Sequence, residues 1–65
     1  MKVLNIETQG YIENIGLLSE INSNFDSGIF DFELSHLDRN YKVKIKSTKL
    51  DEDDERVILI EAKEV

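Results

Sequence analysis

Three groups of residues in this sequence have the types and spacing that chemistry would require. They are a lone histidine near a carboxylate, a run of five carboxylates, and four closely spaced lysines. The pair His36 and Asp38 invites an acid–base interpretation, but general-base catalysis also needs a nucleophile or substrate within reach of the imidazole. We therefore expect His36 to be an ordinary residue at the end of a strand, opposite Tyr41.

No recognisable active-site motif accompanies the histidine. The chain has no glycine-rich phosphate loop, no paired metal-ligand motif and no nucleophile elbow. It also has no cysteine, which removes thiol nucleophiles and thiolate metal sites. A chain of 65 residues is poorly suited to enclosing the roughly 300 Å³ at which small-molecule sites begin. The sequence predicts a protein that is not an enzyme, with no cofactor and no metal.

The carboxylate run lies between two segments that alternate like strands. It lacks the central glycine and the distant bidentate glutamate of a calcium-binding EF-hand loop, so we expect a solvated hairpin loop. Its carboxylates are also suited to meeting a basic surface on a protein partner. The candidate partner-binding residues of the run are Asp51, Glu52, Asp53, Asp54 and Glu55.

The lysines suggest a different partner. Lys42, Lys44 and Lys46 project from one face of a predicted strand, and Lys49 follows them. Proteins that bind single strands of nucleic acid usually add exposed aromatic side chains on which bases stack, and this face has none. Because nearby acidic residues would neutralise two of the lysines, nucleic-acid binding is the disfavoured alternative.

The first half of the chain predicts a strand and a helix. Lys2–Thr8 is rich in β-branched and apolar residues, which is typical of a short strand. Within Tyr11–Phe25 the apolar residues recur on one face of a helical wheel, which favours a helix packed on a sheet. A second strand within residues 11–18 is the alternative, and it would lead to a small five-stranded β-barrel.

The second half predicts three antiparallel strands by period-two alternation. A four-residue turn over 37–40 would pair Leu34 with Val43, and Phe32 with Ile45. It would also set Glu33 against Lys44 and Asp31 against Lys46, so that apolar partners and opposite charges agree. A loop over 51–54 would pair the next two strands as Ile45 with Ile60, Val43 with Ala62 and Lys44 with Glu61.

Two apolar residues of the last strand do not fit the main core face. Val57 and Leu59 fall on the side that otherwise carries Lys46 and Thr48. We add both to the candidate partner-binding residues, because a subunit contact there would help a domain with so small a core. Self-assembly into a homo-oligomer through these residues, or through an unpaired strand edge, is a third functional hypothesis.

The net charge and the composition of the chain disfavour several other classes of function. The formal net charge is −6, which disfavours nonspecific attraction to nucleic acid and to anionic membranes. No apolar stretch is long enough to span a membrane or to form the apolar region of a signal peptide. The absence of disulfides is typical of a reducing compartment, so we predict a cytoplasmic protein.

Together these patterns predict a single α+β domain over residues 1–65. The expected architecture is β-α-β-β-β, a largely antiparallel four-stranded sheet with one helix on one face. The expected function is that of a small acidic noncatalytic protein-binding module, a regulator or inhibitor of the kind that a phage or mobile element encodes.

Overall fold

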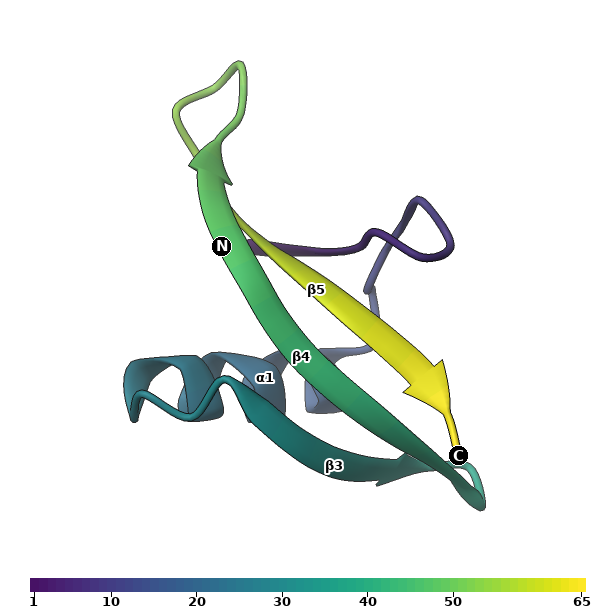
Figure 1. Cartoon of the computed structure of the whole chain (residues 1–65). Helices are drawn as coiled ribbons and strands as arrows, with labels where there is room; N and C mark the ends of the chain where they lie inside the picture. Colours follow the sequence, from purple (N-terminus) through teal and green to yellow (C-terminus); the bar gives the residue numbers. More distant parts are fainter.

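Five strands and one helix follow one another in the computed structural model, which describes all 65 residues (Figure 1). The elements are β1 (Lys2–Asn5), β2 (Gly10–Tyr11), α1 (Ile15–Asp26), β3 (Asp31–His36), β4 (Arg39–Leu50) and β5 (Arg56–Glu64). The strands form one open sheet in the order β2-β1-β5-β4-β3. Only β1 and β5 run parallel.

The α+β class and the single helix agree with the prediction, and two finer points do not. The sheet has five strands, because the predicted first strand ends early and the chain returns as the two-residue strand β2. It is mixed because β1 runs parallel to β5. The alternative of a closed barrel is wrong, because β2 and β3 are unpaired edges of an open sheet.

The helix begins later than its apolar spacing predicts. Asn14 caps it: its side-chain oxygen accepts a hydrogen bond of 3.1 Å from the backbone N–H of Leu17. Tyr11, which shares the helical spacing, instead lies in β2. At the other end the chain leaves the helix through Ser27 and Gly28, and Gly28 has a φ of 75°, where a residue without a Cβ is favoured.

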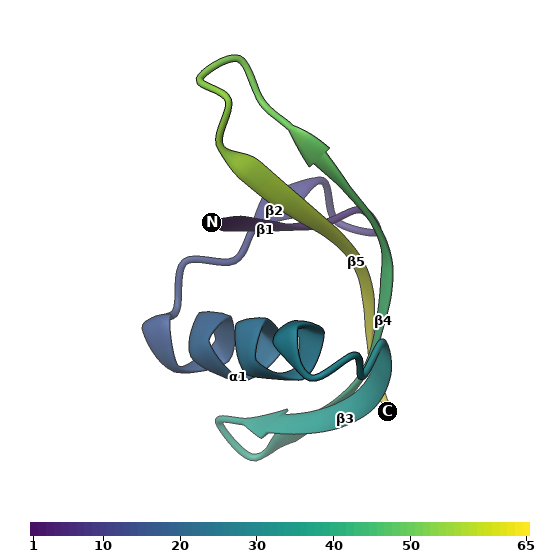
Figure 2. The ribbon, with the colours of Figure 1, turned by 90° about the vertical axis from the view of Figure 1, so that its left-hand side faces the viewer.

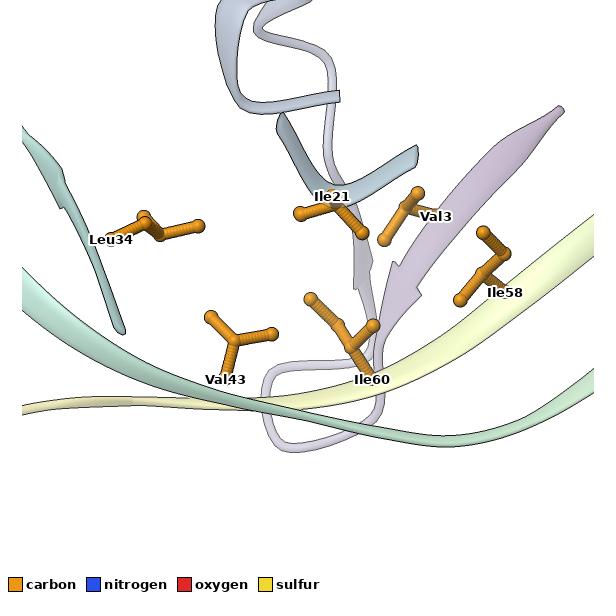
Figure 3. Close-up of a cluster of buried hydrophobic side chains, with 6 residues drawn as sticks. All are labelled: Val3, Ile21, Leu34, Val43, Ile58 and Ile60. Carbon is orange, nitrogen blue, oxygen red and sulfur yellow. The ribbon is translucent and has the colours of Figure 1, made fainter. Parts of the chain in front are cut away.

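The core lies between α1 and the concave face of the curved sheet (Figure 2). In Figure 3, Ile21 of the helix points toward Val43 and Ile60 of the sheet, with Val3 and Ile58 on one side and Leu34 on the other. Partly buried side chains extend this cluster, and they are Ile12, Leu17, Leu18, Phe25, Phe32, Tyr41, Ile45 and Ala62. The burial of so few large side chains is what the length of the chain permits.

The pairing of β4 with β5 confirms the predicted register as far as Ile45. Beyond it the prediction is wrong by one residue, since Thr48 lies opposite Ile58 and does not share a face with Val57. Ile45 lies opposite Ile60, Val43 opposite Ala62, and Lys44 opposite Glu61. Between Ile45 and Ser47 the register shifts by one residue, which leaves Lys46 in a bulge. Beyond the bulge the two strands continue past the helix as a protruding hairpin, which we call the arm: Ser47–Leu50 of β4, Arg56–Leu59 of β5 and the loop between them (Figures 1 and 2).

The predicted register of the first hairpin is wrong by two residues. The turn between β3 and β4 has two residues, Leu37 and Asp38, so that His36 lies opposite Arg39 and not opposite Tyr41. The observed partners of the strand are Leu34 with Tyr41, Phe32 with Val43, Glu33 with Lys42 and Asp31 with Lys44. A shift of two preserves the side-chain alternation, so each residue keeps its predicted face.

The two-residue turn holds a leucine in an unfavourable conformation. Leu37 has a φ of 51° and Asp38 a φ of 62°, the left-handed values that a type I′ turn requires. Asparagine and glycine adopt these values readily, whereas the branched side chain of leucine opposes them. The Leu37 side chain is also 80% exposed, so little burial offsets the strain.

We therefore predict that Leu37→Asn stabilises the protein by about 1 kcal/mol, because it relieves this strain. Chemical denaturation followed by circular dichroism measures the change. Leu50→Asn is the matched control: it also replaces an exposed leucine, but at a position with ordinary backbone angles, and should bring no gain. An unchanged or lower stability for Leu37→Asn would contradict the strain argument.

Candidate functional site

The loop at the end of the arm, residues Asp51–Glu55, is organised by its own first residue. One carboxylate oxygen of Asp51 accepts hydrogen bonds from the backbone N–H groups of Asp53 at 2.9 Å and Glu55 at 2.8 Å. The backbone of Asp51 also bonds to that of Glu55 and Asp54. A short aspartate side chain that bonds to nearby backbone donors favours a tight turn over a continued strand, which is why the hairpin turns here. We call this segment the tip loop.

A lysine from the opposite end of the chain completes the tip loop. The Nζ of Lys2 in β1 lies 3.1 Å from the second carboxylate oxygen of Asp51 and 3.5 Å from a carboxylate oxygen of Glu55. The hydrogen bond to Asp51, followed by the attraction of that carboxylate, raises the pKa of Lys2. The backbone N–H of Glu55, followed by the Lys2 ammonium, lowers the pKa of Asp51.

The five predicted carboxylates thus divide into two sets. Asp51 and Glu55 are partly buried and bind Lys2, so they hold the loop to the sheet. Glu52, Asp53 and Asp54 are exposed, and their side chains form no hydrogen bond or ion pair within the chain. Only these three carboxylates face outward for a partner.

Val57 and Leu59 lie on the sheet face opposite the helix, as their spacing predicts. Val57 is fully buried beside Lys2 and Lys49 in the register, and Leu59 is half-buried beside Leu4. These two side chains therefore pack against their neighbours in the arm and stabilise it. They offer a partner little apolar area.

The exposed apolar side chains of this region come from residues that sequence reasoning did not select. Tyr11 is 54% exposed and Leu50 is 61% exposed. Tyr11 reaches this face because β2 pairs with β1, which sets it beside Leu4. The signal in the sequence was the turn at Gln9-Gly10, after which a strand within residues 11–18 is the alternative to the helix.

These groups meet around an open hollow of about 610 Å³, which we call the tip hollow. Its lining residues are Lys2, Tyr11, Lys49, Leu50, Asp51, Glu52 and Asp53. The Nζ of Lys2 also lies 6.0 Å from the centre of the Tyr11 ring, within the range of a cation–π contact. The hollow therefore combines an aromatic ring, an aliphatic side chain and outward-facing carboxylates on a loop that is held in place.

The lysines of β4 do not form one free basic stripe. Lys46 binds Glu61 at 3.4 Å, and Lys49 lies beyond the bulge in the tip hollow. Lys42 and Lys44 form no ion pair, although Glu33 and Asp31 lie opposite them on β3. Glu61 also binds Lys63 at 3.1 Å, and the hydrogen bonds from Lys63 and then Lys46 lower its pKa.

The candidate acid–base pair is not assembled. No hydrogen bond joins His36 to Asp38, which lies in the turn next to it. The chain contains no group of three histidine, aspartate or glutamate side chains placed to hold a metal ion. Its one helix, α1, is too short and too polar to cross a bilayer.

No protein-family model matches the chain, and no curated protein or solved structure was found that matches it.

The contacts of Asp51 predict a specific pH dependence of stability. Because the pKa of Asp51 is lower in the folded chain than in the unfolded one, its carboxylate stabilises the fold above the unfolded-state pKa. That contribution is lost as the pH falls through the folded-state pKa. Asp51→Asn keeps an acceptor for the two backbone N–H groups but removes the charge, so its stability should fall less than that of the wild type between about pH 5 and pH 2.

Denaturant midpoints measured across this pH range test the prediction. Asp53→Asn is the control, because the Asp53 side chain binds nothing within the chain, and it should follow the wild-type curve. Parallel curves for the wild type and Asp51→Asn would mean that the charge of Asp51, which binds the Glu55 N–H and Lys2, does not stabilise the tip loop.

Proposed function

We propose that this chain is a noncatalytic protein-binding module that binds a basic surface of its partner through the tip hollow. The observation that carries the proposal is the division of the tip-loop carboxylates. Asp51 and Glu55 hold the loop to Lys2, and Glu52, Asp53 and Asp54 are left exposed. A loop that is ordered before binding loses less conformational entropy when a partner arrives.

The chemistry of the hollow supports a protein as the partner. Tyrosine is enriched where protein interfaces gain most of their energy, because its ring offers a large rigid contact area. Here Tyr11 and Leu50 lie beside Glu52 and Asp53 around the same hollow. A lysine or arginine that follows an apolar residue on the partner's surface would satisfy both features.

Two other functions receive weaker support. For nucleic acid, the unpaired Lys42 and Lys44 lie opposite acidic residues, and Lys46 is bound to Glu61. For self-assembly, the burial of Val57 reduces the apolar surface that a second copy would cover. A gel-shift titration at low salt tests nucleic-acid binding, and sedimentation of Leu59→Lys against the wild type tests self-assembly.

The proposed role is that of a regulator or inhibitor in the cytoplasm, of the kind that a phage or mobile element encodes. It rests on the small size, the acidic surface and the lack of an assembled catalytic pair.

We predict that neutralising the exposed tip-loop carboxylates weakens partner binding. Affinity capture from the native cell identifies the partner, and binding is then measured with the purified pair. The variant Glu52→Gln, Asp53→Asn, Asp54→Asn should lower the association rate about tenfold at low salt, because attraction between opposite charges accelerates the encounter. It should also flatten the dependence of that rate on salt concentration.

The matched control neutralises three exposed carboxylates elsewhere, in the variant Glu20→Gln, Asp31→Asn, Glu33→Gln. It changes the net charge by the same amount, so binding near the wild-type rate would locate the effect in the tip loop. Equal losses in both variants would mean that the partner responds to net charge alone. Unchanged kinetics in the tip-loop variant would remove the loop from the contact surface.

A further inference from the structure

An apolar groove lies between the start of α1 and the sheet, at the opposite end of β5 from the tip loop. Its volume is about 380 Å³, more than the length of the chain led us to expect. The lining residues are Asn5, Thr8, Ile12, Leu17, Ile21, Leu34, His36, Arg39, Tyr41, Val43, Ile60, Ala62 and Glu64. We call it the helix groove.

The apolar walls of the helix groove continue the core. Ile21 on the helix faces Val43, Ile60 and Leu34, and these four lining residues are drawn in Figure 3. Ala62 pairs with Val43 in the sheet. Val43 is itself fully buried, whereas the small Ala62 is only half-buried, so the open volume lies beside Ala62, beneath the first turns of the helix. An open apolar groove of this kind can cover the apolar part of a small ligand.

The mouth of the helix groove has polar side chains that are available to a ligand. The side chains of Thr8, His36 and Tyr41 form no hydrogen bond within the chain. Arg39 forms one ion pair, from Nε to a carboxylate oxygen of Glu64 at 3.7 Å, and both side chains are more than half exposed. Such exposed pairs are weak, so the guanidinium remains able to bind another anion.

Asn5 is the remaining polar residue of the lining, and it is already satisfied. Its side chain accepts from the backbone N–H groups of Glu7 at 3.2 Å and Ala62 at 3.3 Å. The free polar groups of the groove are therefore at its mouth, and one of them carries a fixed positive charge. That arrangement matches a ligand with an apolar body and one anionic end.

We propose that the helix groove binds a small apolar monocarboxylate, a free molecule of the class of medium-chain fatty acids. The hydrocarbon chain lies against Leu17, Tyr41 and Ala62, which are half-buried apolar residues of the lining. The carboxylate lies at the mouth, where Arg39 donates to it in the forked geometry that guanidinium groups form with carboxylates, and His36 and Thr8 supply further donors. The volume is near the lower limit for small-molecule sites, which favours a small ligand over a folded partner.

Heteronuclear NMR of the intact chain, titrated with octanoate, tests the proposal. Saturable shifts are expected at the amides of groove residues, among them Leu34, Tyr41, Val43 and Ala62. Octanol has the same tail without the anion and should bind about tenfold more weakly, the loss expected for a charge-assisted hydrogen bond. Acetate has the anion without the tail and should give no saturable shift.

Two substitutions at the mouth have opposite expected effects. Arg39→Gln should weaken octanoate binding about tenfold, because it removes the fixed positive charge. Glu64→Gln should tighten it severalfold, because it removes a competing carboxylate and frees Arg39. Arg56→Gln is the matched control, since Arg56 is exposed at the far end of β5, and it should leave binding unchanged. Arg39, Glu64 and Arg56 are exposed, so we expect all three variants to fold.

A third substitution tests the location of the tail. Ala62→Leu fills the floor of the groove and should abolish binding while the thermal melting transition is retained. The proposal is overturned if octanoate gives no saturable shifts at millimolar concentration, or if octanol binds as tightly as octanoate. It is also overturned if Arg39→Gln and Glu64→Gln change binding in the same direction, or if a folded Ala62→Leu variant binds as the wild type does.

Discussion

The parallel pairing of β1 with β5 is the contact on which the rest of the molecule depends. It joins residues from opposite ends of the chain, from Lys2 opposite Val57 to Asn5 opposite Ile60. Where β1 turns away, the Asn5 side chain continues the pairing: it accepts from the N–H of Ala62 at 3.3 Å and donates to the carbonyl of Ala62 at 3.5 Å. Burying an amide without partners is costly, so these bonds make the substitution of Asn5 by an apolar residue unfavourable. Both candidate sites use this contact, because it brings Lys2 to the tip loop and Ala62 to the floor of the helix groove.

The features of the fold that were predicted best from the sequence are the local and periodic ones. The register of β4 on β5 near Ile45 and Ile60 follows from the alternation together with a loop over 51–54, whereas the bulge at Lys46 has no such signal. The predicted register of the first hairpin was wrong by two residues. A leucine does not indicate a turn with a left-handed φ, which Leu37 adopts here. The two-residue strand β2 was absent from the predicted β-α-β-β-β architecture for a related reason. Tyr11 stands four residues before Ile15, a spacing that a helix also explains, and its pairing with Leu4 is a tertiary contact.

The candidate sites were less predictable than the fold, because their residues meet over long separations in the sequence. The acidic run was visible in the sequence, but its division into inward and outward carboxylates depends on Lys2, which lies 49 residues before Asp51. The helix groove had no signal, since its lining combines residues from β1, α1 and the three long strands. Small apolar residues such as Val43 and Ala62 predict a packed core as readily as a hollow. Whether these residues form a packed core or line a hollow depends on the path of the helix over the sheet.

An open sheet of this size has edges that invite other strands, and the charges along them argue against that route. β3 carries Asp31 and Glu33, so a second copy that paired there in the antiparallel register centred on Phe32 would set these carboxylates opposite one another. The stretch of β4 that extends beyond β3 carries Lys46 in a bulge and Lys49, and both features hinder the addition of a strand. The remaining edge, β2, has only two residues. Recognition by side chains, at the tip hollow and at the mouth of the helix groove, is therefore the mode of binding that this architecture favours.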